Sequence, residues 1–407
     1  MRIWIDEQRN IIKSDSDLLR DVNGKRAGRC VIAEENPYDF VVEFITNMVY
    51  GFEFFLIDAD FSDVEMERMG VSSEMRNRTI EVTQAKRFSS MDELIAAIQG
   101  NWKAWMFTSG TTGLPKMVGH TFRSLTKSVH IGAKHKDDVW AMAFRLSHMA
   151  GLQVFFQALL NSNPLVYIFE SRPDEACAQL ARYNCTHISA TPTFFRNILP
   201  YVHEGGLPAL IRVTCGGERF DTSLAEKIKE KLPTVQVHNI YALTEGGSIF
   251  SSKGDFFEIP QGMERFFRVS EDGELLIHRT LLGDFLFDGE WYNSHDLVQK
   301  DGNRLMFISR KSDLINVGGY KVNPLEVEEV IKQVPGVRDC VVKGRKNSVL
   351  GNILTAEVCL IEGVQPEAAK EEIQRTLKAN LQEYKIPRLI KFVSELLKTA
   401  TGKKVRK

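Results

Sequence analysis

The chain has 407 residues, of which 43% are hydrophobic and 26% are charged. This is ordinary composition for a globular protein and excludes collagen, coiled coil and disorder as good descriptions, and the length suits two or three domains. Lys and Arg together number 52 and Asp and Glu 53, for a formal net charge of -1. A chain this neutral has no overall attraction to nucleic acid or to an anionic membrane, so we expect neither as a partner.

The N-terminus and the cysteines both predict a cytoplasmic protein. The opening residues, MRIWIDEQRNIIKSD, reach an acidic residue at position 6 and lack the apolar core of a signal peptide. The longest apolar runs fall short of the roughly 18–20 residues that span a bilayer. The six cysteines have no CxxC pair, which disfavours a disulfide framework or a zinc site and suits a reducing compartment. We expect all six to be small buried side chains.

The charge is divided unevenly along the chain. Residues 312–407 hold 17 Lys or Arg and 12 Asp or Glu, a net of +5, whereas residues 1–311 hold 35 and 41, a net of -6. The basic C-terminal quarter is either a solvated face or a lid that closes over an anionic ligand.

The predicted elements alternate in the middle of the chain. Residues 102–107 (WKAWMF) predict a strand that runs into a polar loop, and between residues 164 and 241 apolar runs of strand length alternate with helical segments. The predicted strands are 164–170, 185–191, 211–215 and 235–241, and the predicted helices are 174–183, a helix that starts at Pro192, and 221–231. This alternation predicts βαβ units and a mostly parallel sheet, whose ligands gather beyond the carboxyl ends of the strands.

The last third of the chain has a different pattern. Residues 274–307 combine short strands, Gly turns and aromatic residues, which predicts a small β-barrel or antiparallel sheet. Beyond Lys311, the predicted elements are helix 325–333, strands 340–344 and 354–361, helix 366–380 and strand 389–393. We therefore expect an α/β fold with a large N-terminal domain over residues 1–311 and a small mobile α+β domain over residues 312–407.

The segment TSGTTGLPK, from Thr108 to Lys116, carries the strongest chemical signal. It has four hydroxyls, two glycines and one lysine, a set that suits a polyphosphate because it offers many donors and a cation. It is not a Walker A loop, since Pro115 and Met117 stand where that motif needs Gly and Ser or Thr. The alternative is a polar surface loop.

A second polar group follows the predicted strand 235–241. Tyr241 can stack on a purine, Thr244 can donate a hydrogen bond to a phosphate, and Glu245 can hold Mg²⁺, which prefers carboxylate and phosphate oxygens. Taken alone, Tyr241 is more often a core residue.

Five motifs in order resemble the adenylate-forming enzymes, which include acyl- and aryl-CoA ligases, adenylation domains of peptide synthetases and luciferases. They are TSGTTGLPK (108–116), YALTE (241–245), NSHDL (293–297), SRKSDLINVGGYKVNPLEVEEVI (309–331) and KTATGKKVR (398–406). The resemblance covers roughly residues 100–407.

The resemblance implies an ATP or AMP site, with Asp296 and Arg310 at the ribose hydroxyls. The residues it assigns to the nucleotide are Thr108, Ser109, Gly110, Thr111, Thr112, Gly113, Lys116, Gly217, Glu218, Asn239, Tyr241, Ala242, Thr244, Asp296 and Arg310. Gly216, Gly217 and Glu218 would line the adenine and acyl pocket. Their alternative is a turn before a helix, with Glu218 as its cap.

The catalytic residues implied by the resemblance are Lys403, Thr244, Glu245 and Lys116. Lys403 would reach the carboxylate and the α-phosphate, and Glu245 would also hold the metal ion. The physical reason is that attack of a carboxylate on a phosphate brings two anions together, so a well-placed cation lowers the barrier. Without this context, a lysine so near the C-terminus would be a solvated charge.

The resemblance also implies a hinge at Ser312 and a channel for the acyl group and coenzyme A. The small domain would swing about the hinge and present Lys403 in one orientation and Gly318, Gly319 and Tyr320 in the other. His148 would flank the channel from the loop at residues 146–152. The alternatives are a plain turn at the two glycines and a satisfied core position for His148. That loop lacks the Asp with which members that activate amino acids hold the α-amine, so a free amino acid is not the expected substrate.

Some positions depart from the family pattern. Ala242 replaces the usual Gly, Leu397 the usual Pro, and Ser294 and His295 the usual Thr-Gly. The phosphate loop also begins earlier than in the family, at Thr108. We therefore expect part of the N-terminal subdomain to be absent, with consequences for the wall of the acyl pocket.

Together these features predict an ATP-dependent, AMP-forming acid–CoA ligase that uses ATP, Mg²⁺ and coenzyme A. The acid is expected to be aryl or hydrophobic, with Phe194, Phe195 and residues 246–252 at its pocket. One alternative is an enzyme that loads the acyl group onto a carrier-protein phosphopantetheine, a partner that the basic C-terminal part could dock. Another is a non-catalytic binding module, which would have no need for Lys116, Glu245, Asp296 and Lys403 together.

Overall fold

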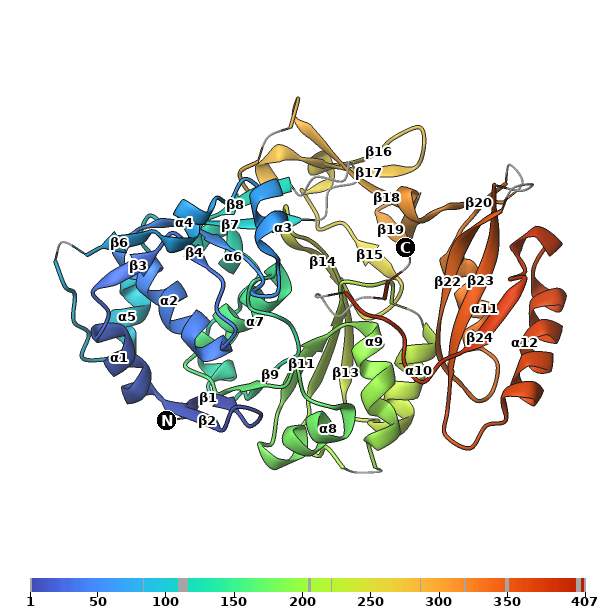
Figure 1. Ribbon diagram of the computed structural model, residues 1–407, viewed down its shortest axis with the longest axis horizontal. Helices are drawn as coiled ribbons and strands as arrows, with labels where there is room; N and C mark the ends of the chain where they lie inside the picture. Colours follow the sequence, from blue (N-terminus) through green and yellow to red (C-terminus); the bar gives the residue numbers. More distant parts are fainter. Residues whose placement is uncertain are drawn as a thin grey trace.

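The computed structural model describes residues 2–82, 84–108, 116–203, 206–220, 222–285, 287–317, 320–347, 351–399 and 404–405. Figure 1 shows a body that holds most of the chain and a C-terminal unit beside it, drawn in orange and red. Among the described residues, no helix has the length and apolar content needed to cross a bilayer.

An eight-stranded sheet forms the centre of the body. Its order is β14-β13-β12-β11-β9-β10-β1-β2, with parallel pairing everywhere except at the two edges, where β2 and β14 run antiparallel to their neighbours. The strands are β1 (Arg2–Asp6), β2 (Ile11–Ser14), β9 (Trp140–Met142), β10 (Leu165–Tyr167), β11 (His187–Ala190), β12 (Arg212–Gly216), β13 (Gln236–Leu243) and β14 (Gly247–Ser252). This confirms the predicted parallel sheet.

A four-stranded sheet lies on the N-terminal side of the body, in the order β4-β5-β7-β8. Its strands are β4 (Val31–Ile32), β5 (Glu53–Leu56), β7 (Lys103–Thr108) and β8 (Lys116–His120), and a separate pair is formed by β3 (Ala27–Arg29) and β6 (Thr79–Glu81). Thr108 and Lys116 pair across β7 and β8, so the two ends of the predicted phosphate loop are held side by side.

Helices bury apolar faces against these sheets. They are α1 (Asp15–Asn23), α2 (Pro37–Tyr50), α3 (Asp63–Arg68), α4 (Ser73–Asn77), α5 (Met91–Ala97), α6 (Phe122–Thr126), α7 (Met149–Leu159), α8 (Pro173–Arg182), α9 (Pro192–Ile198) and α10 (Thr222–Lys231). The helix α2 is buried on most of its surface; it starts at the Asn36 cap with Pro37 in its first turn and ends at Gly51, whose φ of 73° suits a residue without Cβ. Two apolar cores result, one around α2 and α7 and one around α8, α9 and α10.

A five-stranded antiparallel sheet follows, at the top of Figure 1, in the order β15-β19-β18-β17-β16. Its strands are β15 (Phe256–Glu258), β16 (Phe267–Val269), β17 (Glu274–His278), β18 (Trp291–Asp301) and β19 (Arg304–Arg310). Of the two predicted alternatives for residues 274–307, the structure therefore has the antiparallel sheet.

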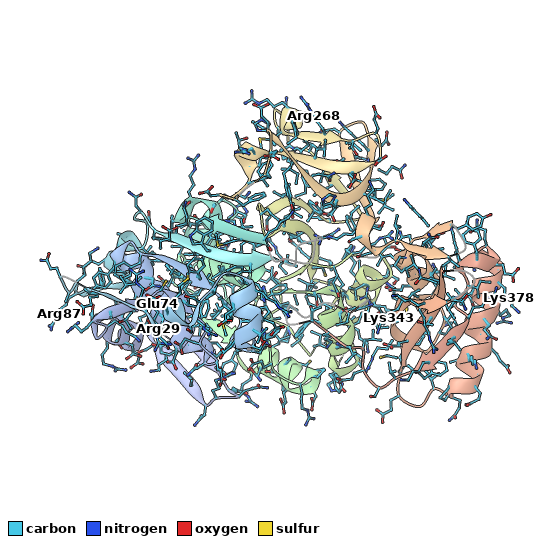
Figure 2. All side chains as sticks on the ribbon, turned by 45° about the horizontal axis from the view of Figure 1, so that its top comes forward. Arg29, Glu74, Arg87, Arg268, Lys343 and Lys378 are labelled. Atoms are coloured by element: carbon cyan, nitrogen blue, oxygen red, sulfur yellow. The ribbon has the colours of Figure 1, made fainter. Side chains whose placement is uncertain are left out.

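The C-terminal unit has its own core and is of α+β type. It contains β20 (Ile315–Val317), β21 (Tyr320–Val322), α11 (Pro324–Lys332), β22 (Val337–Asn347), β23 (Gly351–Leu360), α12 (Pro366–Asn380) and β24 (Leu389–Phe392). Apolar residues of α11, α12 and the β22-β23-β24 sheet pack together in a cluster separate from those of the body. In Figure 2, Lys343 of β22 lies on the side of this unit that faces the body, and Lys378 of α12 lies on the far side.

Most predicted elements agree with the structure to within a few residues. One difference is at residues 146–152, which were expected as a loop: the helix α7 begins at Met149, with His148 as its N-cap residue. Met149–Leu159 is apolar nearly all round and packs into the core, and this burial favours a helix. All six cysteines are buried and free, as expected.

Candidate active site

The residues predicted to bind the ribose meet where β13 faces β18 and β19. The Tyr241 hydroxyl donates a hydrogen bond to Oδ2 of Asp296 at 2.5 Å, and Nε of Arg310 donates to Oδ1 at 2.9 Å. Asp296 and Arg310 are direct partners across β18 and β19, which explains how two residues 14 positions apart come into contact. The structure thus joins three of the predicted residues in one network.

The electrostatics of this network keep the Tyr241 hydroxyl and the Arg310 guanidinium protonated. Burial and the nearby Asp296 carboxylate raise the pKa of Tyr241 far above its usual value. Burial alone would lower the pKa of Arg310, but Asp296, Tyr241 and Asp313 together outweigh burial and raise the pKa. Asp296 is only 1% exposed, and Tyr241 and Arg310 remain donors to its carboxylate.

Glu245 belongs to a second network beside the first. Its Oε1 accepts a hydrogen bond from the Tyr292 hydroxyl at 2.6 Å, and both residues are buried. Nζ of Lys116 lies 5.3 Å from the centroid of the Tyr292 ring, within cation–π range. Burial and the Glu245 carboxylate raise the pKa of Tyr292 well above its usual value, so its hydroxyl stays a donor. One tyrosine thus contacts the predicted phosphate-binding lysine and the predicted metal-binding glutamate.

His120 holds the Thr244 turn against the strand that starts at Lys116. It is completely buried in β8, and its Nε2 lies 2.9 Å from the carbonyl oxygen of Thr244. Because a carbonyl only accepts, Nε2 carries the proton in this tautomer. Burial lowers the pKa of His120 to about 4, so the ring is neutral at pH 7. A backbone hydrogen bond from Gly283 to the Glu245 carbonyl fixes the next residue as well.

Tyr292 and His120 were not predicted from the sequence. Tyr292 lies in the same aromatic segment as Asp296, and His120 is four residues beyond Lys116 in one strand. Proximity to a predicted site residue is therefore the signal that could have found them.

Glu218 contacts protein groups on both of its carboxylate oxygens. Oε2 accepts from the backbone nitrogen and the hydroxyl of Thr193, at 3.0 and 2.6 Å, in the first turn of α9. Oε1 accepts from the backbone nitrogen of Lys404 at 2.9 Å. Glu218 thus caps the first turn of α9, a helix that precedes it in the chain, whereas the alternative predicted a cap for the helix that follows it. Gly217, directly before it, has a φ of 82° and makes the sharp turn possible.

Other predicted nucleotide residues lie along the same strand ends. Gly216 is the last residue of β12, and Ala242 follows Tyr241 at an irregularity in the pairing of β13 with β14. Nδ2 of Asn239 donates to the carbonyl of Gly254 at 3.2 Å.

His148 is paired with a carboxylate. Its Nε2 lies 3.0 Å from Oδ2 of Asp58, and Ser147 donates to the other oxygen of the same carboxylate. Burial alone would raise the pKa of Asp58, but His148, Ser147 and Arg145 together lower it. His148 is thus satisfied by a partner, but its side chain is 27% exposed, so it does not have the core position that the alternative predicted. Asp58 was not predicted, and its distance of 90 positions from His148 leaves no local signal.

A cleft of about 310 Å³ lies beside this pair. Its charged lining residues are Arg9, Glu34, Glu35, Asp58, Asp60, Arg145 and Glu170. Carboxylates outnumber the arginines, so the cleft is a poor place for an anion.

The remaining predicted residues are spread over the molecule. Tyr320 of β21 is 59% exposed and stacks on Tyr384 at 4.4 Å between ring centroids, within the C-terminal unit. His148 lies in the body next to α7, and Figure 1 shows α7 and β20 in separate parts of the molecule, so the structure does not bring His148 and Tyr320 together. Ser312 lies in a short 3-10 turn directly after β19, where its hydroxyl bonds to Asp313.

The predicted acyl-pocket residues differ in burial. Phe195 is buried in the core around α8, α9 and α10, and Phe194 packs against it half-buried. Residues 246–252 include the edge strand β14, where Ser248 donates to Gln153 of α7 at 3.0 Å.

Several predicted residues lie outside the described part of the chain: Ser109, Gly110, Thr111, Thr112, Gly113, Gly318, Gly319 and Lys403. For Thr108 the structure describes the backbone only. In the part that is described, no group of three or more His, Cys, Asp or Glu residues could hold a metal ion. The single Glu245 carboxylate fits Mg²⁺, which takes most of its ligands from water and substrate phosphates.

Comparison with known proteins places this geometry in a family. Residues 24–266 match the model of the AMP-binding enzyme family, and residues 326–403 match that of the AMP-binding enzyme C-terminal domain. A 2-succinylbenzoate–CoA ligase of Listeria monocytogenes is 28% identical over 323 residues, which cover 73% of this chain and 67% of the relative. The enzyme of the same name from Bacillus subtilis is 25% identical over 392 residues, which cover 88% and 77% of the two chains.

Solved structures share the fold at low sequence identity. The anthranilate–CoA ligase AuaEII in complex with anthranoyl-AMP superposes with a TM-score of 0.74 at 20% identity, covering 99% of this chain and 92% of that one. The Bacillus subtilis o-succinylbenzoate–CoA synthetase with its acyl-adenylate intermediate superposes with a TM-score of 0.70 at 20% identity, covering 100% and 94%. Because the first family model alone matches more than half of its residues, this chain belongs to the AMP-binding enzyme family.

Proposed function

We propose that the protein is an ATP-dependent carboxylic acid–CoA ligase that forms AMP. The observation that carries the proposal is the pair of adjoining networks, Tyr241–Asp296–Arg310 and Tyr292–Glu245 with Lys116, in a member of the AMP-binding enzyme family. The relatives named as acid–CoA ligases support the same reaction.

In the first step, a carboxylate oxygen of the acid attacks the α-phosphorus of ATP. A new oxygen–phosphorus bond forms, the bond to the β-phosphate oxygen breaks, and pyrophosphate leaves. Asp296 accepts from the ribose hydroxyls and Arg310 donates to them, while the Thr244 hydroxyl donates to the α-phosphate. Lys116 and Lys403 supply positive charge where two anions meet. Mg²⁺, held by Glu245 and phosphate oxygens, would neutralise part of the polyphosphate charge.

In the second step, the thiol of coenzyme A attacks the acyl carbonyl. The carbon–sulfur bond forms, the bond from the acyl carbon to the adenylate oxygen breaks, the thiol proton is lost, and AMP leaves. We propose that residues 312–407 turn about Ser312 between the steps, so that Gly318, Gly319 and Tyr320 replace Lys403 at the site. His148, held by Asp58, would then line the acyl and thiol channel.

The acid is proposed to be aromatic or hydrophobic, and the enzyme to work in the cytoplasm. The names of the curated relatives support an aromatic acid. We keep the phosphopantetheine of a carrier protein as the alternative acceptor, because residues 312–407 have a net charge of +5.

The experiment is a panel of acids incubated with ATP and Mg²⁺, with coenzyme A or with a phosphopantetheinylated carrier protein. The panel includes 2-succinylbenzoate, anthranilate, benzoate and straight-chain acids of increasing length. We expect AMP and pyrophosphate with at least one aromatic acid, and a CoA thioester detected by mass spectrometry. Thioester on the carrier protein alone would replace the CoA assignment, and the formation of ADP in place of AMP would contradict the proposal.

A further inference from the structure

The C-terminal unit meets the body through a set of ion pairs that do not belong to either network of the candidate active site. The chain after β24, here called the tail, is described over residues 393–399 and 404–405 and passes from the C-terminal unit to α9 and α10 of the body (Figure 1). There Nζ of Lys404 donates to Oδ1 of Asp339 at 2.6 Å and to the carbonyl of Cys340 at 2.8 Å. Both charged side chains are almost completely buried, at 5% and 3% exposed.

The body contributes to the same cluster. Arg196 of α9 lies 3.8 Å from the other oxygen of Asp339, and its side chain is 7% exposed. Burial alone would raise the pKa of Asp339, but Lys404, Arg196 and Lys332 together lower it. Asp339 is in β22, which contacts α9 directly. A carboxylate of the C-terminal unit is thus held between a lysine of the tail and an arginine of the body.

The tail is also closed on itself and attached to the body by its backbone. Lys398 and Lys404 pair as an antiparallel bridge, and the nitrogen of Val405 donates to the carbonyl of Leu397 at 2.9 Å. The nitrogen of Lys404 donates to Glu218, directly after the glycines at the end of β12. Lys404, the residue after Lys403 in the sequence, is therefore fixed at both its backbone and its side chain.

A third connection lies nearer the solvent. NH2 of Arg219, before α10, lies 2.9 Å from Oε1 of Glu329 in α11, with the two side chains 23% and 33% exposed. This ion pair joins the body to the C-terminal unit without passing through the tail.

We propose that Arg219, Glu329, Arg196, Asp339 and Lys404 are positioning residues for the adenylation step. Together they hold the C-terminal unit in the orientation that keeps Lys404 on Glu218 at the end of β12, and we propose that the adenylation step requires this orientation. The inference rests on the proposed function for its catalytic readout. The second step does not need this orientation, so it does not need these contacts.

The Arg219–Glu329 ion pair provides the test. Because it is partly exposed, its charges can be reversed without burying an unpaired charge. The variants are Arg219→Glu, Glu329→Arg and the double exchange. The matched control is Lys343→Glu, since Lys343 pairs with Glu357 at the same 2.9 Å but inside the C-terminal unit. Three quantities are measured: acid-dependent ATP–pyrophosphate exchange, thioester formation from a supplied acyl-adenylate, and the rate of tryptic cleavage after Lys311.

We expect the Arg219→Glu and Glu329→Arg variants each to lower the rate of ATP–pyrophosphate exchange about tenfold, a coupling within the range for contacting charges. The double variant should restore the rate. Thioester formation from supplied acyl-adenylate stays at the wild-type rate, and cleavage after Lys311 is faster in the single variants only. The control keeps wild-type values in all three assays.

The inference is overturned if the double variant catalyses ATP–pyrophosphate exchange as slowly as the single variants do. It is also overturned if the single variants lower the rates of both half-reactions together. If the wild type shows no exchange with any acid, the proposed function fails; faster cleavage in the single variants, reversed in the double, would still support the contacts as those that hold the unit in place.

Discussion

Tyr292 connects Lys116 and Glu245, the two charged residues to which we assign the handling of the polyphosphate. Its hydroxyl bonds to Glu245, and its ring lies under the Lys116 ammonium group. A hydrogen bond to a charged group contributes about 1.5–3 kcal/mol, and here both partners are buried. Glu245 is therefore held in one orientation before any ligand arrives.

Replacing Tyr292 by Phe separates these two contacts. The Tyr292→Phe variant keeps the ring for Lys116 but leaves Glu245 without its donor. We expect pyrophosphate exchange to fall about tenfold and half-maximal exchange to require more Mg²⁺. The matched control is Tyr183→Phe, which removes a hydroxyl that donates to Glu7 at the same 2.6 Å, away from the site. Equal Mg²⁺ dependence of the two variants would contradict the assigned role.

His120 makes the stability of the protein depend on pH. Burial lowers its pKa from 6.5 to about 4 in the fold. Below pH 6.5 the unfolded chain therefore takes up a proton that the folded chain does not. The contribution of His120 is fully present above pH 6.5 and is lost as the pH falls from there towards 4.

Urea unfolding at pH 7.5 and 5.0 measures this effect. Between the two pH values we expect the wild type to lose about 2 kcal/mol of unfolding free energy through His120. His120→Gln keeps a donor at the length of Nε2 for the Thr244 carbonyl but lacks the titration, so its loss should be smaller by that amount. His203→Gln, at an exposed histidine, is the control and should behave as the wild type does. An equal pH dependence in His120→Gln would refute the assignment.

At the scale of elements, the short helix α9 connects the body to the tail. Thr191 is its N-cap residue, and its side-chain oxygen accepts from the backbone nitrogen of Phe194 at 3.1 Å. In the same first turn, the backbone nitrogen of Thr193 donates to Glu218. A lost N-cap costs about 1 kcal/mol.

The Thr191→Ala variant is compared with Ser90→Ala, which removes the N-cap of α5. We expect both to lose about 1 kcal/mol of stability in urea unfolding. Thr191→Ala alone should also slow pyrophosphate exchange, because α9, unlike α5, contacts Glu218, and Glu218 in turn contacts the tail. A matching loss of exchange in Ser90→Ala would show that the effect is one of general stability.

The sequence was informative wherever local pattern decides structure. Between residues 164 and 241 the strands and helices agree with the prediction because each apolar run is bounded by polar or Gly-Pro signals. The ends of those strands bear Tyr241 and Glu245, and parallel topology brings strand ends together. Residues 293–310 add Asp296 and Arg310, which meet because they pair across two adjacent strands.

The contacts that support these residues were not predictable in the same way. Tyr292 and Glu245 are 47 positions apart, His120 and Thr244 are 124 apart, and His148 and Asp58 are 90 apart. No periodicity spans such distances, and each pair depends on how two sheets pack. The helix start at Met149 was not predicted. Ser147 and His148 are typical of a polar turn, and the apolar residues that form the helix begin only after them.

For the molecule as a whole, the first step should depend on Lys403 near the end of the chain, and the second step should not. Lys403→Ala is expected to reduce acid-dependent pyrophosphate exchange to background, because the positive charge between the two anions is lost. Thioester formation from supplied acyl-adenylate should persist. The control is Lys407→Ala, which removes an equal charge four residues later. Exchange at the wild-type rate in Lys403→Ala would remove Lys403 from the mechanism.

An acyl-adenylate that links the two steps leaves an isotopic trace in the AMP. The acid is labelled with ¹⁸O in both carboxylate oxygens and converted with ATP and coenzyme A, and the AMP is analysed by mass spectrometry. If the carboxylate attacks the α-phosphate, one labelled oxygen stays on phosphorus when the thiol displaces AMP. The account therefore predicts one ¹⁸O in each AMP and none in pyrophosphate. Unlabelled AMP, or label in pyrophosphate or phosphate, would contradict it.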